Sequence, residues 1–223
     1  MFNFRQNSVG TVIEFILEKT LGDKMKSKIV ISLFVFLISF SQTSARRIEF
    51  GDFHRILSKH GNWVNVDRGG LVWTPINVER GWKPYTNGRW FWTEFGWFWD
   101  SDDPFGWITH HYGRWENNKY YGWVWHPGYE WAPAWVKWRV SGDYIGWRPL
   151  TPNGRFNHAH GLFFNKSVSI HFNNWNFVKI EKVNNRSIRR HLVRSHRIAE
   201  IYKYSEAVSD YYVLNDVVFC GAN

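Results

Sequence analysis

Paired tryptophans set the pattern of this chain between residues 61 and 150, a stretch that holds 15 of the 16 tryptophans. Each pair brackets a short segment with polar or turn-forming residues near its middle. Side chains of a strand alternate between the two faces of a sheet, so two tryptophans opposite each other across a turn predict a β-hairpin. The four pairs are Trp63 and Trp73, Trp90 and Trp99, Trp115 and Trp125, and Trp138 and Trp147.

The first and fourth brackets have favourable turn chemistry. In the first, the three-residue loop Asp67–Gly69 ends on glycine, which suits the positive φ that such loops need. In the fourth, the two-residue turn Gly142–Asp143 places Val140 opposite Ile145. Both sequences favour tight hairpins with a defined register.

The second and third brackets have weaker turn signals. Their predicted turns, Glu94–Phe95 and Lys119–Tyr121, contain no glycine. In the second hairpin the expected register places Trp92 opposite Trp97, and a slip of one residue would send every side chain to the other face. The register of these two hairpins therefore depends on the tryptophan pairs themselves.

The pattern predicts an all-β fold of four stacked antiparallel β-hairpins over residues 53–150. Residues 151–223 form a C-terminal extension in which 161–174 alternates moderately, whereas 188–213 mixes apolar and basic residues without a clean period. For this extension we expect a few short strands or irregular structure packed on the domain.

Aromatic residues exceed what a small interior holds. With 16 Trp, 18 Phe and 10 Tyr in the chain, a domain of about 100 residues cannot hide every ring. Most of the tryptophans are expected to be core, because bulky rings fill a small β domain with few residues. Grouped exposed rings mark contact with a ligand or partner, and the candidate ligand-binding rings are Trp82, Trp107 and Trp131.

The N-terminal region carries an export signal. Residues 25–45 combine Lys26 and Lys28 with an apolar run of about 12 residues and the small residues before Ala45, a pattern typical of a secretory signal peptide. We therefore expect residues 1–24 to be an upstream extension and the mature chain to begin at Arg46. An uncleaved membrane anchor is the alternative, although the apolar run is short for a membrane span.

Charge is distributed unevenly along the chain, whose formal net charge is +9. Residues 61–150 hold nine basic and nine acidic residues, whereas residues 151–223 hold ten and five. The basic residues of 182–197 could bind anionic lipid, lipopolysaccharide or acidic polymers, but a solvated face is the more common role of such a cluster. Export disfavours nucleic acid as a partner.

Few residues suggest metal or nucleophile chemistry. Cys220 is the only cysteine, so no internal disulfide forms, and we place it in a frayed tail. His158 and His160 could share a strand face, but nothing in the spacing of these or the other histidines selects zinc. No metal site and no cofactor is expected. The other histidines considered are His110, His111, His126 and His171.

Acidic residues offer one enzymatic alternative. Asp100, Asp102 and Asp103 crowd one turn, where their side chains are expected to bond nearby backbone N–H groups. A hydrolase would instead need two convergent carboxylates, as in glycosidases. The pairs considered join Asp102 or Asp103 with Glu94 or Glu130.

Glycine precedes tryptophan four times, in Gly96–Trp97, Gly106–Trp107, Gly122–Trp123 and Gly146–Trp147. We expect these dipeptides to begin strands, where the missing side chain lets a neighbouring ring lie on the backbone.

Residues 53–149 resemble a bacterial family of exported proteins known as domain of unknown function 6600. The resemblance implies a Trp-rich β domain and export across the inner membrane, with no assigned activity or catalytic residues. The stretches that carry it are His60–Trp63, Gly81–Tyr85, Gly88–Trp90, Gly106–Trp107, His111–Trp115, Gly122–Gly128, Trp131–Val136 and Gly146–Pro149.

The sequence thus favours an exported, non-enzymatic protein that is periplasmic, associated with the outer membrane or secreted. Its expected role is a binding or assembly module that uses exposed aromatic surfaces, with an envelope glycan or another envelope protein as partner. The alternative is a periplasmic carbohydrate-active hydrolase that uses an Asp/Glu pair.

Overall fold

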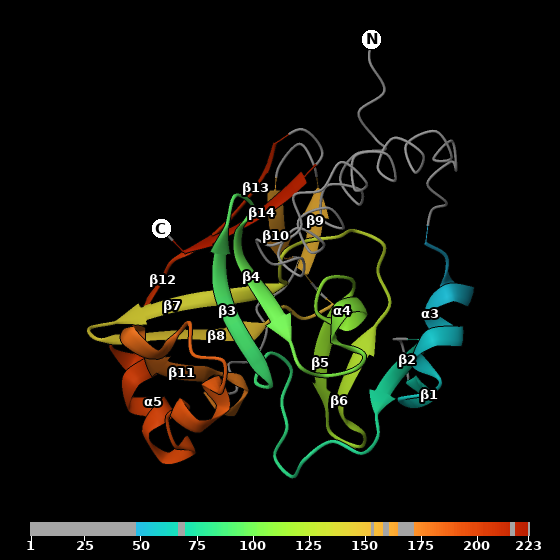
Figure 1. Ribbon diagram of the computed structural model, residues 1–223, viewed down its shortest axis with the longest axis horizontal. Helices are drawn as coiled ribbons and strands as arrows, with labels where there is room; N and C mark the ends of the chain where they lie inside the picture. Colours follow the sequence, from blue (N-terminus) through green and yellow to red (C-terminus); the bar gives the residue numbers. More distant parts are fainter. Residues whose placement is uncertain are drawn as a thin grey trace, which may run out of the picture. The chain divides into compact units, whose positions relative to one another are not determined.

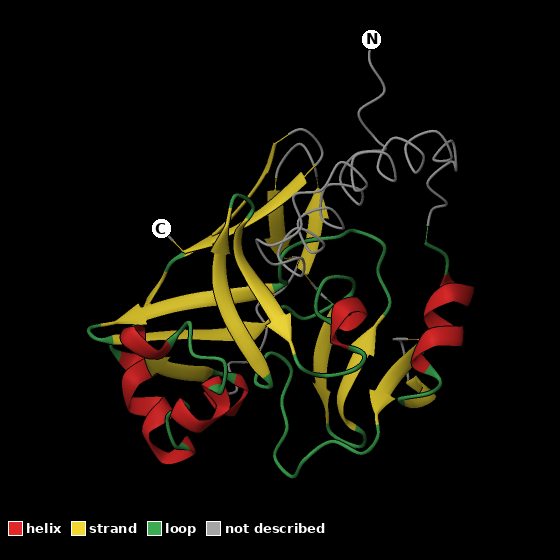
Figure 2. Ribbon diagram, viewed as in Figure 1, coloured by secondary structure: helices red, strands yellow, loops and turns green. Residues whose placement is uncertain are grey.

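The computed structural model describes residues 48–66, 70–152, 154–157, 161–164, 172–214 and 217–222. Their helices and strands belong to one compact unit that spans Glu49–Asn223 (Figures 1 and 2). Antiparallel hairpins dominate this unit, as the tryptophan pattern predicts. None of the helices in these ranges is long and apolar enough to cross a membrane.

A short helix that the sequence pattern did not predict, α3 (Phe50–Leu57), precedes the first hairpin. Its first turn is stabilised by the Asp52 carboxylate, which accepts a hydrogen bond of 3.1 Å from the backbone N–H of Glu49. Phe53 and Leu57 are four residues apart, so they share one face of the helix, and both are fully buried. The folded unit therefore begins a few residues before the predicted domain start at residue 53.

All four predicted hairpins are present with the predicted tryptophan registers. In the second, Trp90 lies opposite Trp99 and Trp92 opposite Trp97; in the fourth, Val140 lies opposite Ile145. Three of the four predicted turns are confirmed, and Asp67–Gly69 lies outside the described residues. The strands are β1 (Gly61–Val66), β2 (Gly70–Pro75), β3 (Gly88–Thr93), β4 (Gly96–Ser101), β5 (Arg114–Asn118), β6 (Gly122–His126), β7 (Val136–Ser141) and β8 (Tyr144–Pro149).

Glycines just after the loops supply the turn chemistry that Glu94–Phe95 and Lys119–Tyr121 lack. Gly96 has a φ of 90° and Gly122 a φ of 69°, a region that other residues rarely adopt. The expected role of these two glycines was to seat a ring, but their positive φ is the stronger requirement. Rings do lie against Gly146, from Phe177, and against Gly106, from His110, but Gly106 begins the short helix α4 (Gly106–Thr109) and Gly146 lies inside β8, so neither begins a strand.

The hairpins combine into sheets in different ways. The first and third share one four-stranded sheet of order β1-β2-β6-β5, joined where Trp73 lies opposite Trp125. The second and fourth each lie in a separate sheet and gain strands from the C-terminal extension. The extension is therefore part of two sheets rather than an appendage.

The extension contains more regular structure than its sequence pattern indicates. Its strands give the orders β11-β8-β7-β12 and β13-β14-β4-β3, with β9 and β10 forming a hairpin of their own. Figure 1 shows β11 and α5 alongside β7 and β8. The elements are β9 (Gly154–Asn157), β10 (Gly161–Phe164), η2 (Phe172–Asn174), β11 (Asn176–Lys179), η3 (Ile180–Lys182), η4 (Ile188–His191), α5 (Ser195–Lys203), β12 (Glu206–Ala207), β13 (Ser209–Leu214) and β14 (Val217–Ala222).

The expected short strands of the extension are present, together with helices that the pattern did not predict. Residues 188–213, which lack a clean period, contain η4, α5, β12 and most of β13, and Ile198 and Ile201 of α5 pack with Trp175 and Phe177 in a small cluster that Tyr144 of β8 also contacts. Cys220 is not in a frayed tail, since β14 pairs with β4 at Cys220 and Gly96.

Tryptophan rings fill the interior and also fasten loops to it. The Trp90 ring lies 4.6 Å from that of Trp138 and 5.0 Å from that of Trp99, measured between centroids. Other indoles donate their N–H to carbonyls at the C-terminal ends of the short helices: Trp73 to Leu57 of α3 at 3.0 Å and Trp115 to Thr109 of α4 at 2.8 Å. A phenylalanine could fill the same space but could not make these bonds.

Candidate functional site

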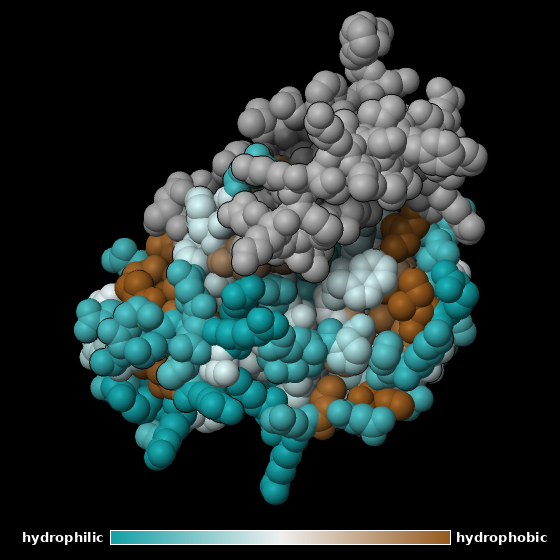
Figure 3. Space-filling view, viewed as in Figure 1, coloured by the Kyte–Doolittle hydropathy of each residue, from teal (hydrophilic) through white to brown (hydrophobic). Residues whose placement is uncertain are grey.

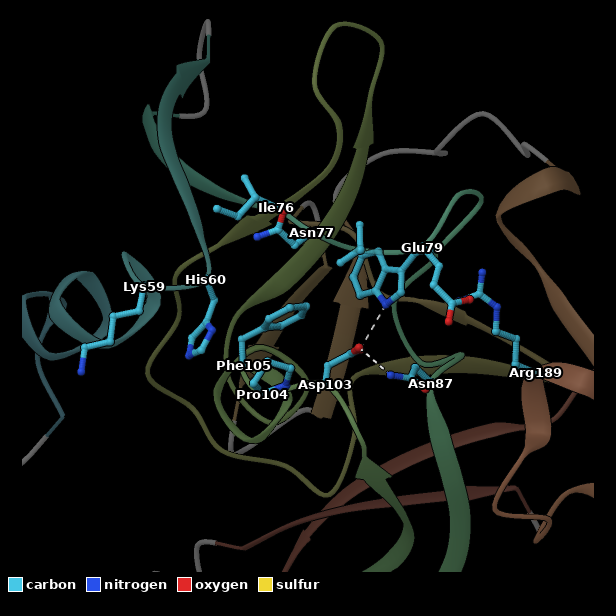
Figure 4. Close-up of a pocket in the computed structure, with 12 residues that line it drawn as sticks. Lys59, His60, Ile76, Asn77, Glu79, Asn87, Asp103, Pro104, Phe105 and Arg189 are labelled. Carbon is cyan, nitrogen blue, oxygen red and sulfur yellow. Dashed lines mark hydrogen bonds and ion pairs between the residues drawn. The ribbon is translucent and has the colours of Figure 1, made fainter.

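A cleft of about 280 Å³ lies where the connection between the first two hairpins meets α4 and the extension (Figure 4). Its volume is just below the range of about 300–1,000 Å³ typical of small-molecule sites, so it suits a small ligand. Aromatic, amide and charged side chains share its walls. The lining residues are Lys59, His60, Ile76, Asn77, Val78, Glu79, Trp82, Asn87, Asp103, Pro104, Phe105 and Arg189.

The chain connecting β2 to β3, residues 76–87, builds one wall of the cleft. Within the described part of the chain, the two non-glycine residues with positive φ are Asn77 (57°) and Tyr85 (60°), and both lie in this connection. Such conformations persist only where surrounding contacts enforce them, and they cluster at functional sites.

Tyr85 is the anchor of this connection. Its hydroxyl donates to the carbonyl of His110 at 2.8 Å and accepts a hydrogen bond from the backbone N–H of Trp135 at 3.1 Å. Its own carbonyl accepts the indole N–H of Trp147 at 2.9 Å. With the side chain 1% exposed, this network holds the strained backbone in place and fixes the position of the cleft wall.

A hydrogen-bonded set of three side chains forms the polar part of the cleft. Oδ2 of Asp103 accepts the indole N–H of Trp82 at 3.1 Å, and Oδ1 accepts a bond of 2.8 Å from the side-chain amide of Asn87 (Figure 4). Trp82 and Asn87 come from the β2–β3 connection, and Asp103 comes from the segment between β4 and α4. The set is therefore rigid, as a binding site for a polar ligand requires.

Burial changes the acidity of Asp103. The loss of water around its carboxyl raises the pKa, while the hydrogen bonds from Asn87 and Trp82 partly offset the increase. The charge of Asp102 raises the pKa further, and that of Arg189 lowers it. Carboxyl groups with raised pKa values in clefts are common at functional sites.

The extension supplies Arg189, which stands in the cleft wall in η4. Its guanidinium lies 3.0 Å from the carboxylate of Glu79 and donates to the carbonyl of Arg80 at 3.2 Å. Arg186 in turn lies 3.5 Å from Asp102. The basic stretch is therefore not simply a solvated face, because two of its arginines meet carboxylates of the hairpin region.

The three predicted aromatic ligand residues lie in different environments, and their rings do not contact one another. Trp82 is 6% exposed, so the expectation of an exposed ring is wrong there, although its indole lines the cleft. Trp107 is 54% exposed, and Trp131 is half-buried with its ring stacked on His111 at 5.9 Å. On the face shown in Figure 3, hydrophilic side chains predominate and apolar residues form separate patches.

The three aspartates of the turn each face a different side chain instead of local backbone N–H groups. Asp100 pairs with Arg89 at 2.9 Å, Asp102 faces Arg186, and Asp103 holds Trp82 and Asn87. The expected turn role is wrong, because side chains from other segments of the chain, and not neighbouring backbone N–H groups, contact these carboxylates. Glu94, in the β3–β4 turn, and Glu130 do not line the cleft, whose carboxylates are Asp103 and Glu79.

The histidines do not form a metal site among the described residues, where no group of three His, Cys, Asp or Glu side chains could hold an ion. His126 bonds Glu116 at 2.9 Å, and His110 and His111 are buried in the core. His158, His160 and His171 lie outside the described residues.

Sequence reasoning missed Asn87, Glu79 and Arg189 as site residues. Glu79 and Asn87 lie in the β2–β3 connection, whereas Arg189 lies in the extension, and only the joining of the two regions brings Arg189 to them. The positive-φ residues Asn77 and Tyr85 left no signal in composition or periodicity. The sequence features that pointed to this connection are the Gly81–Tyr85 stretch that carries the family resemblance and Trp82 within it, chosen as a ligand-binding ring.

Comparison with known families defines the class of this region. Residues 54–154 match the model of a family of unknown function, DUF6600. The recognition made from the sequence motifs is confirmed: this stretch, with its four hairpins and most of the cleft, is a domain of that family. Neither the curated proteins nor the solved structures include a significant match to the chain.

Proposed function

We propose that the protein is an exported, non-enzymatic binding module of the bacterial cell envelope, and that its cleft holds a small polar ligand, a sugar unit of an envelope glycan. The observation that carries the proposal is the locked set of Trp82, Asp103 and Asn87 in the cleft wall. Sugar-binding sites combine a ring with amide and carboxyl groups that take hydroxyls. Export is supported by the signal-peptide pattern of residues 25–45.

The free acceptor positions of this set favour hydrogen bonding of a polar ligand in the cleft over a ligand held only by stacking on exposed rings. Asn87 keeps its side-chain oxygen as an acceptor, and each Asp103 oxygen has a second lone pair for a hydroxyl. Trp107 and Trp131 remain candidate contacts for a larger glycan or for another envelope protein, because both present ring surface outside the core.

Titration of the mature protein with soluble peptidoglycan fragments and with lipopolysaccharide, followed by tryptophan fluorescence, tests the proposal. Saturable quenching is expected for the glycan that the cleft accepts. Trp82→Phe keeps a ring but removes the N–H donated to Asp103, so it should weaken binding about tenfold or more. Trp92→Phe, at an exposed tryptophan outside the cleft, is the matched control and should bind as the wild type does. Absence of saturable binding to every glycan, with both variants folded, contradicts the proposal.

A hydrolase is the second candidate, favoured by one observation: the raised pKa of the Asp103 carboxyl, a property that a general acid needs. Its partner carboxylate in the cleft would be Glu79 rather than the predicted Glu94 or Glu130. Release of reducing ends from peptidoglycan by the wild type, abolished by Asp103→Asn, would establish the enzyme. Binding without release of reducing ends supports the module.

A further inference from the structure

We infer that the ligand of the cleft carries a carboxylate, and that this group binds Arg189 in place of the Glu79 side chain. The inference rests on the proposed function, because it names the class of sugar that the same cleft takes: an acidic saccharide. It starts from the unequal way in which the two members of the Arg189–Glu79 pair are held.

Arg189 is fixed, whereas Glu79 is exchangeable. The arginine side chain is 29% exposed and donates a second bond to the carbonyl of Arg80, so its guanidinium keeps its orientation. The Glu79 side chain is 79% exposed, and the ion pair is its one described contact with the cleft. Exposed ion pairs contribute little to stability, so a ligand carboxylate can replace Glu79 at low cost.

The chemistry of the guanidinium selects the incoming group. Arginine presents a planar set of donors that matches a carboxylate, whereas a neutral hydroxyl uses only one of them. Glu79 itself demonstrates the fit, since its carboxylate already lies 3.0 Å from the guanidinium. We therefore expect Glu79 to act as an internal competitor for the ligand.

The rest of the cleft is compatible with an anionic ligand. Lys59 and His60 line the end opposite Arg189, and neither has an ion pair within the described part of the chain (Figure 4). The Lys59 side chain points away from the cavity, so it adds positive potential rather than a contact. Asp103 is the other carboxyl of the cleft, and both of its oxygens are already bonded to Trp82 and Asn87.

Two pairs of probes each contrast an acidic sugar with a neutral one. N-acetylmuramic acid carries a carboxylate on the lactyl ether at O3 of N-acetylglucosamine, and glucuronate carries one in place of the hydroxymethyl group of glucose. Calorimetric titration of the mature protein should give at least about tenfold tighter binding of the acidic member in one pair. Which pair shows the preference locates the carboxylate on the sugar ring.

Variants of the ion pair test the mechanism. Glu79→Gln removes the competitor, so affinity for the acidic sugar should rise by up to about fivefold while affinity for the neutral sugar stays constant. Arg189→Gln should abolish the preference, and Arg189→Lys should keep part of it. Arg186→Gln and Glu181→Gln remove the same charges outside the cleft and should change nothing.

The outcomes separate this inference from the proposed function. Equal affinity for acidic and neutral sugars, or a preference that survives Arg189→Gln in a folded variant, overturns the inference but leaves a glycan-binding module. Failure of all four sugars and of peptidoglycan fragments to bind overturns the proposed function as well.

Discussion

The hairpin region and the C-terminal extension achieve order by different means. In the hairpins, tryptophan pairs across strands fill a shared interior and their indoles fasten the loops. The extension instead packs on the hairpins. Its strands β11, β12 and β14 pair with strands of the hairpin sheets, and its rings pack on arginines of β7 and β8. The hairpins thus share a core of packed indoles, whereas the extension combines a small apolar cluster of its own, around Trp175 and Phe177, with strands that pair with the edges of the hairpin sheets.

The largest expected difference follows from removing one tryptophan of each region. Trp90 is fully buried at the centre of the hairpin core, and Trp175 is 3% exposed in the cluster with Phe177 and α5. Trp90→Ala should lower the free energy of unfolding of the whole unit by about 3–5 kcal/mol, because it leaves a large cavity. Trp175→Ala should mainly release the extension.

Hydrogen exchange distinguishes these two outcomes. For Trp175→Ala, amides of 172–222 should lose protection while those of β1, β2, β5 and β6 keep it. Equal loss of protection throughout the unit would mean that hairpins and extension share a single core.

Acid should weaken the hairpin core through its buried histidines. Burial lowers the pKa of His111 to about 4 and that of His110 well below its usual value, so both stay neutral in the folded protein. The unfolded chain takes up protons near pH 6.5. The free energy of unfolding therefore has its full value, as far as these histidines determine it, above about pH 6.5. It falls as the pH is lowered towards 4, by about 3 kcal/mol for His111 alone.

Urea unfolding between pH 7.5 and 4.5 measures this loss. His111→Asn keeps a polar side chain without a basic ring nitrogen, so its stability should depend less steeply on pH than that of the wild type. An identical pH dependence in the variant would assign the acid sensitivity to other groups.

Arginine contacts between the two regions should have intermediate effects. The Arg139 guanidinium lies 4.4 Å from the centre of the Tyr202 ring and donates to the Ser205 hydroxyl at 2.6 Å. Arg139→Met should lower the free energy of unfolding by about 1–3 kcal/mol, since it leaves polar groups of a partly buried contact without partners. Thermal unfolding of the variant provides the measurement, and no change would show that docking rests on apolar packing alone.

The smallest effect is expected at the exposed pair between Arg186 and Asp102, where the arginine side chain is 70% exposed. Arg186→Met should change the free energy of unfolding by less than about 0.5 kcal/mol. It serves as the matched control for Arg139→Met, because both substitutions remove one charge that connects the two regions. A larger effect at Arg186 than at Arg139 would reverse this account of the docking.

Much of the hairpin region could be predicted from sequence, because its signals are local. Cross-strand tryptophans and short loops specify the register between neighbouring strands. Glu94–Phe95 forms the predicted turn although it contains no glycine. The extension could not be predicted in this way, since several of its strands pair with strands of the hairpin region that are distant in sequence: β11 pairs with β8, β12 with β7 and β14 with β4.

The cleft was predicted least well. Trp82 was predicted to be an exposed ring, yet it is buried, and it contributes to the cleft through the indole N–H that it donates to Asp103. Arg189 and Glu79 are 110 residues apart in the sequence and share no motif, so their pairing depends on how the extension packs on the hairpin region. Local patterns carry strand registers, whereas a site assembled from a strained connection and a docked helix leaves no local pattern.

The most direct test of the account follows the indole N–H of Trp82 by ¹⁵N nuclear magnetic resonance while N-acetylmuramic acid is added, with Trp82→Phe assigning the signal. The account predicts a saturable shift of the Trp82 indole and of the Asn87 side-chain amide, with the Trp107 and Trp131 indoles unmoved. Saturable shifts at Trp107 or Trp131 while Trp82 stays constant would contradict it and would place binding on the exposed rings.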